Sequence, residues 1–203
     1  MAEAQSRPTS EQLRAELNRV SRKGGGAVFG KFLLILILLI LILAVLAVIL
    51  LPGFVIYGNS MAPTMDEGDV VLAWPCRAEQ SDSIFSRLCP MPESGDIVAF
   101  HYGERILIKR VIGCPGDSVE ILADGTVVLN GNALTESYAE VASISISDVK
   151  YPCTVPENAY FVLGDNRGNS VDSRNTIIGM VSGDQVIGRI FGTVWPLSRL
   201  KLM

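Results

Sequence analysis

Twenty consecutive apolar residues, from Phe32 to Leu51, constrain this chain more than any other feature of its sequence. As an α-helix they would rise about 30 Å, which is the thickness of the hydrocarbon core of a bilayer. A cleaved export signal is the competing interpretation, but its apolar region is usually about 7–15 residues long and ends at a small-x-small site. Here the run continues into Pro52-Gly53-Phe54 without such a site. We therefore predict a retained transmembrane helix over residues 32–51.

Charge on either side of this run predicts its orientation. Residues 1–31 carry a net charge of +3 and residues 52–203 a net charge of −7. Because basic residues near a membrane span stay cytoplasmic, we expect a cytoplasmic basic tail over residues 1–31. Residues 52–203 are then an extracytoplasmic domain, held at the inner cell membrane by a single pass.

The tail itself carries one helix signal and one stop signal. Thr9 with Gln12 resembles a capping box, which begins a helix. Gly24-Gly25-Gly26 is expected to end that helix before the membrane span.

Composition excludes several classes of protein. The chain is 49% apolar, yet without residues 32–51 the remainder has the ordinary composition of a folded soluble domain. A disordered chain, a polytopic membrane protein and a fully soluble protein are thereby excluded. The formal net charge of −4 argues against a nucleic-acid partner, which calls for a basic domain.

All four cysteines follow the apolar run, at Cys76, Cys89, Cys114 and Cys153. An oxidising compartment outside the membrane permits disulfides. Cys76 and Cys89 flank a short polar stretch typical of a stapled loop, which leaves Cys114 and Cys153 as a second pair. Four cysteines allow three connectivities, and the sequence does not choose among them. A zinc site is disfavoured because there is no C-x-x-C and the single histidine, His101, is far from any cysteine pair. We expect no metal and no cofactor.

After residue 52 the pattern changes to short apolar runs separated by turns, which predicts a mainly β domain. Asp124-Gly125 is a strong hairpin signal, and Asn130-Gly131-Asn132 is a second turn. No run of twelve or more residues has a convincing helical period. Many short strands with regular turns indicate an antiparallel sandwich or barrel. The predicted strands are residues 69–74, 96–101, 106–113, 118–122, 126–129, 159–163 and 186–195.

Three polar or charged features in this domain are candidates for one active site. Ser60 lies in Gly58-Asn59-Ser60-Met61-Ala62-Pro63-Thr64-Met65 as a candidate nucleophile, although a serine among Gly, Asn and Pro usually belongs to a turn. Lys109 shares the apolar face of its strand with Leu107 and Val111. Its stem either packs there while the ammonium reaches water, or burial lowers its pKa and makes a neutral amine available as a base.

The third candidate is the polar segment from Gly164 to Arg174, which follows an apolar strand. It can be read as an Asx-rich turn or as a rigid scaffold that orients active-site groups. A calcium loop is the third reading, but the last ligand position of an EF-hand would fall on Thr176 instead of Glu.

One chemistry unites the three segments. A Ser-His-Asp triad would have to use His101, whereas a Ser–Lys pair gives the base role to Lys109 and needs no histidine.

Together these segments resemble the type I (leader) signal peptidases, which are membrane-anchored serine–lysine endopeptidases. The resemblance rests on Ser60-Met61-x-Pro63-Thr64-Met65 and on Gly95-Asp96 leading to Ile108-Lys109-Arg110-Val111-Ile112-Gly113. It continues in Pro115-Gly116-Asp117 and in Gly164-Asp165-Asn166-Arg167-x-Asn169-Ser170-x-Asp172-Ser173-Arg174. These matches occur in one order behind an anchor, from about Phe54 to Gly188.

The resemblance implies a role for each matched catalytic position. Ser60 attacks the scissile carbonyl and its backbone N–H donates to the oxyanion, while Lys109 takes the hydroxyl proton. Ser170 hydrogen-bonds the Lys109 amine, and Asp172 and Arg174 form an ion pair that braces the loop. The implied substrate is the signal peptide of an exported pre-protein, cleaved after a small-x-small motif and bound as an added β-strand. The positions implied to line shallow substrate pockets are Phe54, Ile56, Met61, Met65, Leu107 and Ile108.

Two positions depart from the pattern of this family. A Ser or Thr that completes the oxyanion hole in many relatives is replaced by Gly58, and a common Asp in the last motif is replaced by Gly168. Two other functions remain open: a specialised conjugation or secretion-system peptidase of the same chemistry, and an anchored β-domain without activity. The lipid bilayer is the second expected partner. Trp195 and Leu197 are candidates for contact with it, although a core position for Trp195 is favoured over the interface.

Overall fold

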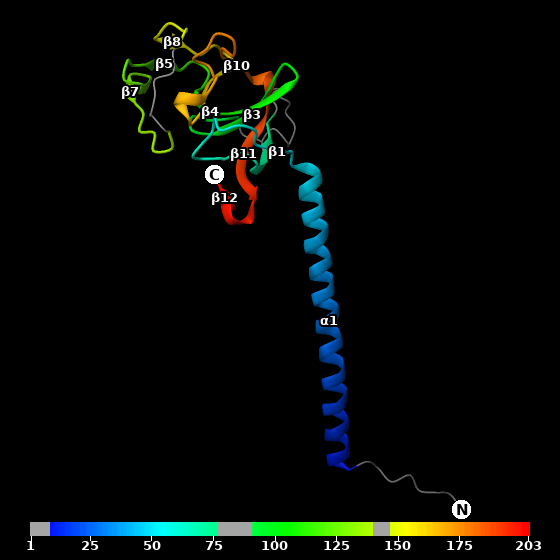
Figure 1. Ribbon diagram of the computed structural model, residues 1–203. Helices are drawn as coiled ribbons and strands as arrows, with labels where there is room; N and C mark the ends of the chain where they lie inside the picture. Colours follow the sequence, from blue (N-terminus) through cyan, green and yellow to red (C-terminus); the bar gives the residue numbers. More distant parts are fainter. Residues whose placement is uncertain (1–8, 77–90, 140–146) are drawn as a thin grey trace, which may run out of the picture. The chain divides into compact units, whose positions relative to one another are not determined.

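The computed structural model describes residues 9–76, 91–139 and 147–203 and divides into two units, Met1–Leu50 and Leu51–Met203 (Figure 1). The first unit consists of helix α1, Ser10–Leu50. The second unit contains all of the strands.

Helix α1 begins at the predicted cap. The Thr9 backbone N–H donates to Gln12 Oε1 over 3.1 Å, and the Leu13 N–H donates to the Thr9 carbonyl over 3.1 Å. The predicted break at Gly24–Gly26 is wrong, because α1 continues through these residues. Each glycine costs about 1 kcal/mol relative to alanine, but helix propagation is cooperative. The many helical turns on both sides therefore stabilise the helix through the three glycines.

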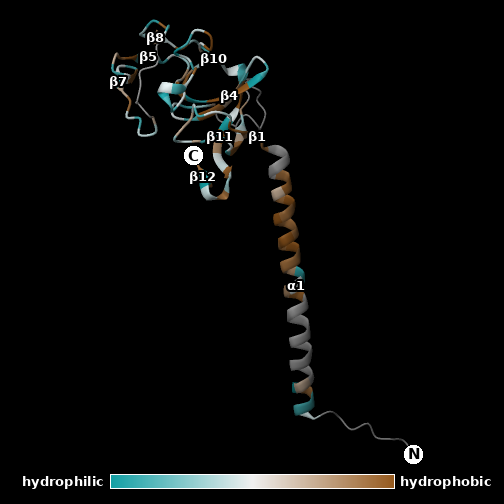
Figure 2. Cartoon of the chain, in the orientation of Figure 1, coloured by the Kyte–Doolittle hydropathy of each residue, from teal (hydrophilic) through white to brown (hydrophobic). Residues whose placement is uncertain are grey.

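The apolar stretch of α1 matches a membrane span. Residues Val28–Leu46 have a mean hydropathy of 3.1, and none of this stretch is buried within the protein. Figure 2 shows hydrophobic colouring along most of this part of the helix, interrupted by hydrophilic colouring near its N-terminal end. An apolar surface of this length is unfavourable in water, and this stretch of α1 is long and apolar enough to cross a membrane.

The second unit is built on an antiparallel sheet of eight strands, in the order β1-β2-β11-β3-β4-β9-β10, with β12 paired to β11. Along these strands, apolar residues either alternate with polar residues or form continuous runs. The inner faces of the strands are therefore apolar and buried. Their bounds are β1 Gly53–Val55, β2 Val70–Pro75, β3 Ile97–Tyr102, β4 Arg105–Gly113, β9 Ala159–Leu163, β10 Val181–Ser182, β11 Val186–Trp195 and β12 Lys201–Leu202.

A second antiparallel sheet has the order β7-β6-β5-β8. The predicted hairpin joins β5 to β6, with Ile121 paired to Val127 across the Asp124-Gly125 turn. Three short 3₁₀ helices, η1 Arg167–Asn169, η2 Gly183–Gln185 and η3 Leu197–Arg199, complete the described elements. The bounds of the strands are β5 Ser118–Ile121, β6 Val127–Leu129, β7 Asn132–Ala133 and β8 Cys153–Thr154.

The antiparallel, mainly β fold class is confirmed, and a strand is present in each of the seven predicted segments. The predictions missed β1, β7, β8, β10 and β12, which are only two or three residues long. So short a strand has no room for a period-two pattern, and partner strands fix it instead.

Two expectations about single residues are corrected by the fold. Trp195 is 57% exposed, so the predicted core position is wrong; it ends β11, beside the exposed Leu197 of η3. Cys114 and Cys153 are free thiols and pack against different apolar clusters, so they do not form the second disulfide. The proposed partner of Cys76, Cys89, lies outside the described residues.

Candidate active site

Ser60 lies in the turn that connects β1 to β2. The turn is closed by backbone hydrogen bonds from Ala62 to the Asn59 carbonyl and from Met65 to the Met61 carbonyl. Met61 and Met65, both 1% exposed, pack into an apolar cluster with Val71 and Ala73 of β2. This cluster anchors the turn, so the half-buried Ser60 is held on a packed base.

Lys109 is delivered to the same place by the strand register. It lies in β4 opposite Val98 of β3. On the other side of β4, Arg110 pairs with Leu163 at the end of β9, which places Lys109 opposite Gly164. The side chain is enclosed, with only 4% of the residue exposed.

The Lys109 amine and the Ser60 hydroxyl are in direct contact. Lys109 Nζ donates to Ser60 Oγ over 2.7 Å, within the distance expected of a nucleophile and its base. Burial lowers the pKa of Lys109 from 10.5 to about 8, while the carboxylates of Asp172 and Asp165 oppose this change. With a pKa of about 8, roughly a tenth of the amine is neutral at pH 7, and a neutral amine can accept the hydroxyl proton.

The polar segment that follows β9 surrounds this pair. Asp172 and Arg174 form the predicted ion pair, with 2.8 Å between Asp172 Oδ1 and Arg174 Nε. Asp172 Oδ2 also accepts a 3.0 Å hydrogen bond from the Gly164 backbone N–H. The expected hydrogen bond between Ser170 and Lys109 is not formed: Ser170 Oγ is buried and has no hydrogen-bond partner among the described residues.

The same segment also holds the backbone of the serine turn. The Asn166 N–H donates to the Ser60 carbonyl over 3.1 Å, and Asn166 Nδ2 donates to the Asn59 carbonyl over 3.2 Å. A Cβ added to Gly164 would lie 2.6 Å from the Ser60 carbonyl oxygen and 2.2 Å from Ser170 Oγ. The absence of a side chain at position 164 thus allows the two segments to touch.

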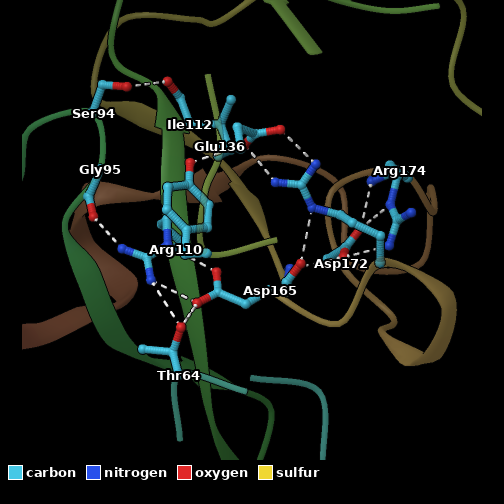
Figure 3. A network of polar contacts seen from close by, with 12 residues as sticks. Thr64, Ser94, Gly95, Arg110, Ile112, Glu136, Asp165, Asp172 and Arg174 are labelled. Carbon is cyan, nitrogen blue, oxygen red and sulfur yellow. Dashed lines mark hydrogen bonds and ion pairs between the residues drawn. The ribbon is translucent and has the colours of Figure 1, made fainter. Parts of the chain in front are cut away.

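A charged network joins the strand of Lys109 to this loop (Figure 3). Arg110 donates to both oxygens of Asp165, over 2.8 Å from Nε and 2.6 Å from Nη2. Its Nη1 donates to the Gly95 carbonyl over 2.8 Å. Thr64, in the serine turn, donates from its hydroxyl to Asp165 over 2.5 Å. Asp165 therefore links β4 to the serine turn.

The sequence prediction did not give Arg110, Asp165 and Thr64 roles, although each lies inside a quoted motif. The sequence signal that could have paired Arg110 with Asp165 is that each lies beside an apolar strand segment, because charges buried there are usually paired. The network is extended by Glu136, Tyr138 and Arg167. The sequence gave no signal that pairs them, since the Arg110–Tyr138 contact spans 28 positions and the Glu136–Arg167 contact spans 31.

The six predicted pocket positions divide into two groups. Ile56, Met61 and Met65 are buried in one cluster, with the partly buried Phe54 and Ile108 packed against it. Leu107 packs against a different cluster. Ile56, Met61 and Met65 are therefore buried, whereas Phe54, Leu107 and Ile108 are only partly buried.

Comparison with known proteins decides the family. The model of the family described as "Signal peptidase, peptidase S26" matches residues 29–195. The chain belongs to the signal peptidase family.

Two named relatives agree with this assignment. Signal peptidase I of Leptolyngbya laminosa is 35% identical over 156 residues, which cover 71% of this chain and 69% of that protein. Signal peptidase I T of Bacillus subtilis is 32% identical over 162 residues, covering 75% of this chain and 78% of that protein. The crystal structure of a signal peptidase I from Enterococcus faecalis is 36% identical, covers 50% of this chain and 97% of that chain, and gives a TM-score of 0.41.

Other residues considered for catalysis or metal binding in this signal peptidase either lie away from Ser60 and Lys109 or already form ion pairs. His101 is exposed and pairs with Ile106 of β4. It lies three positions along β3 from Val98, the strand residue opposite Lys109. Asp165 and Asp172, the carboxylates available to a calcium loop, are each paired with an arginine. Within the described residues, no group of three or more His, Cys, Asp or Glu side chains is arranged to hold a metal.

Proposed function

We propose that this member of the signal peptidase family cleaves peptide bonds with Ser60 as nucleophile and Lys109 as general base. The observation that carries the proposal is the 2.7 Å contact between Lys109 Nζ and Ser60 Oγ at a buried amine. Burial serves the reaction directly, because it favours the uncharged form that can remove a proton.

The proposed reaction proceeds in two stages. Ser60 Oγ attacks the scissile carbonyl carbon while its proton moves to Lys109 Nζ. The C–N bond then breaks, and the Lys109 ammonium gives that proton to the leaving nitrogen, which leaves an ester on Ser60. Water attacks the ester, passes a proton to Lys109, and Ser60 regains its proton as the new carboxylic acid departs.

Backbone amides supply the oxyanion contacts in this proposal. Gly58 has no side chain to donate, and its φ of 76° lies in the left-handed region that favours glycine. The proposed donor is the backbone N–H of Ser60, the residue that also carries the attacking hydroxyl. Mutational studies of such donors elsewhere give about 2.7–4 kcal/mol of transition-state stabilisation for one of them.

The proposed substrate is the signal peptide of a pre-protein, bound in an extended conformation. β9 pairs with β4 only from Arg110 onward, so in the described chain no strand pairs with residues 105–108 on that side. A substrate strand can add there, next to Leu107 and Ile108, and reach Lys109 at its end. The apolar surface around Phe54 then receives small side chains, which agrees with a small-x-small specificity.

The proposed location is the inner membrane, with the N-terminal tail in the cytoplasm and residues 52–203 outside. Supporting this, the tail carries a net charge of +3 and residues 52–71 contain no Lys or Arg. Ser60 lies eight residues after Pro52, which keeps the reaction close to the bilayer where signal peptides emerge.

The direct test compares cleavage of a purified pre-protein by the wild type, Ser60→Ala and Lys109→Met. Both variants should lose cleavage, and Thr126→Ala in the β5–β6 turn serves as a control that keeps it. The wild-type rate should rise with pH and level off above about 8, because Lys109 must lose its proton. A folded variant that keeps cleavage, or a rate that is flat from about pH 6 to 9, contradicts the assigned roles.

A further inference from the structure

The segment after β7, residues 136–138, approaches the active-site loop from the second sheet. Its start is held by a 2.9 Å hydrogen bond from the Leu134 N–H to the Val127 carbonyl of β6. The Glu136 side chain is only 8% exposed. Burying a carboxylate to that extent costs free energy unless it is paired with a cation or with hydrogen-bond donors.

Glu136 pairs with an arginine of the active-site loop. Arg167 Nη1 donates to Glu136 Oε2 over 2.9 Å, and Nη2 donates to Oε1 over 2.5 Å. The Tyr138 hydroxyl donates to the same carboxylate over 2.9 Å. Two-point contacts of this kind fix direction as well as distance, so the position of Arg167 follows that of Glu136.

Tyr138 contacts the second arginine of the network. The Arg110 guanidinium carbon lies 3.9 Å from the centre of the Tyr138 ring, a cation–π contact. The ring thus covers one face of the guanidinium that holds Asp165. Figure 3 shows Arg110 beside Asp165 and Thr64, with Asp172 and Arg174 on the opposite side of Asp165.

The two arginines hold consecutive residues of the loop that touches Ser60. Arg167 Nε donates to the Gly164 carbonyl over 3.0 Å, while Arg110 holds the Asp165 carboxylate. The next residue, Asn166, donates from its backbone to the Ser60 carbonyl. A shift of residues 136–138 would therefore be passed to the nucleophile through two buried ion pairs.

We propose that Glu136 and Tyr138 are positioning residues for the peptidase reaction, holding the Gly164–Asn166 backbone against Ser60 from the second sheet. This inference rests on the proposed function, because it assigns Ser60 as the nucleophile. The second sheet thereby contributes to catalysis without touching Ser60, Lys109 or the substrate strand. A displacement of about 1 Å at a reacting group can reduce a rate by roughly a hundredfold.

The test measures kcat and KM of the full-length protein on a signal-peptide substrate for Glu136→Gln, Tyr138→Leu and Tyr138→Phe. The first two should lower kcat by roughly tenfold to a hundredfold while KM stays within about twofold, because the pocket and the substrate strand are unchanged. Tyr138→Phe keeps the ring over Arg110 and should lose less. Because Glu136 acts through Arg167, the double variant Glu136→Gln/Arg167→Met should be no slower than the slower single variant.

Two controls separate positioning from stability. Val119→Ala removes a buried side chain of β5 in the same sheet and should lower Tm while kcat at assay temperature is unchanged. Glu120→Gln repeats the charge change on the same strand and should leave both quantities unchanged. The inference is overturned if Glu136→Gln and Tyr138→Leu keep wild-type kcat, or if kcat falls for Val119→Ala in proportion to Tm. Retention of cleavage by Ser60→Ala in the same assay would instead contradict the proposed function.

Discussion

Lys109 carries a cost in stability that follows from its burial. Its pKa is about 8 in the folded protein, whereas an unfolded chain protonates lysine up to about pH 10.4. The folded state is therefore penalised most below pH 8, and the penalty disappears as the pH rises toward 10.4. Lys109→Met removes the charge and keeps an apolar stem of similar length.

We expect Lys109→Met to increase the free energy of unfolding at pH 7 by roughly 3 kcal/mol while it abolishes cleavage. The gain should shrink as the pH approaches 10, because wild-type lysine is then neutral in both states. Urea denaturation of the detergent-solubilised protein at pH 7 and pH 10 measures both values. Equal stability of the two proteins at pH 7 would show that the amine is not buried as a destabilising charge.

The sequence indicates Lys109 because a lysine on the apolar face of a strand is unusual, whereas Ser60 is indicated only when its segment is taken together with the other motifs. It does not indicate their support in the same way. Ser170 matches the family motif, yet its hydroxyl has no hydrogen-bond partner in the described part of the chain. Glu136 and Tyr138 are ordinary residues of a polar stretch, and only the folded chain brings them to Arg167 and Arg110. Long-range ion pairs leave no periodic pattern from which to predict them.

Among the elements, β11 is the strand on which the larger sheet depends, since it pairs with β2, β3 and β12. Gly188 lies in it where the register with β3 shifts between Val186 and Gly188. A Cβ at this position would lie 2.5 Å from the Trp74 carbonyl oxygen of β2. The glycine therefore allows β2 and β11 to approach closely.

Gly188→Ala should lower the free energy of unfolding by about 1–3 kcal/mol, because the methyl group forces the two backbones apart. Gly53→Ala in β1 is the matched control: its added methyl would meet a Leu72 side-chain carbon at an ordinary 3.5 Å. That variant should stay within about 0.5 kcal/mol of the wild type. Urea denaturation of both variants gives the comparison, and equal losses would show that the strand separation relaxes without cost.

The long strands were predictable because their apolar runs are long enough to show a strand pattern. β1 and β10 are too short for that and owe their conformation to pairing with β2 and β9. β1 illustrates the point, since only three residues pair with β2, yet they lead directly to the Ser60 turn. The helix boundary was mispredicted for a related reason. Gly24–Gly26 weakens a helix locally, but a 41-residue helix is stabilised by its length.

For the whole molecule, function depends on which side of the membrane receives residues 52–203. The basic residues nearest the span all precede it, and residues 52–71 contain none. Asp and Glu contribute little to this choice, so the acidic residues between positions 52 and 203 are not the determinant. The five residues that should set the orientation are Arg14, Arg19, Arg22, Lys23 and Lys31.

Replacing these five residues with Gln should leave part of the population inserted with the tail outside, because no other charge near the span opposes it. Protease added to spheroplasts would then remove a tag on the tail, which stays protected in the wild type. The control replaces the exposed Arg105, Lys150 and Lys201 with Gln, all more than 50 positions beyond the span, and should not alter protection. Because an inverted molecule holds Ser60 and Lys109 in the cytoplasm, cleavage of exported pre-proteins in these cells should fall in proportion to the inverted fraction. Complete protection of the tail in the five-residue variant would show that the outer domain, and not the tail, determines the orientation.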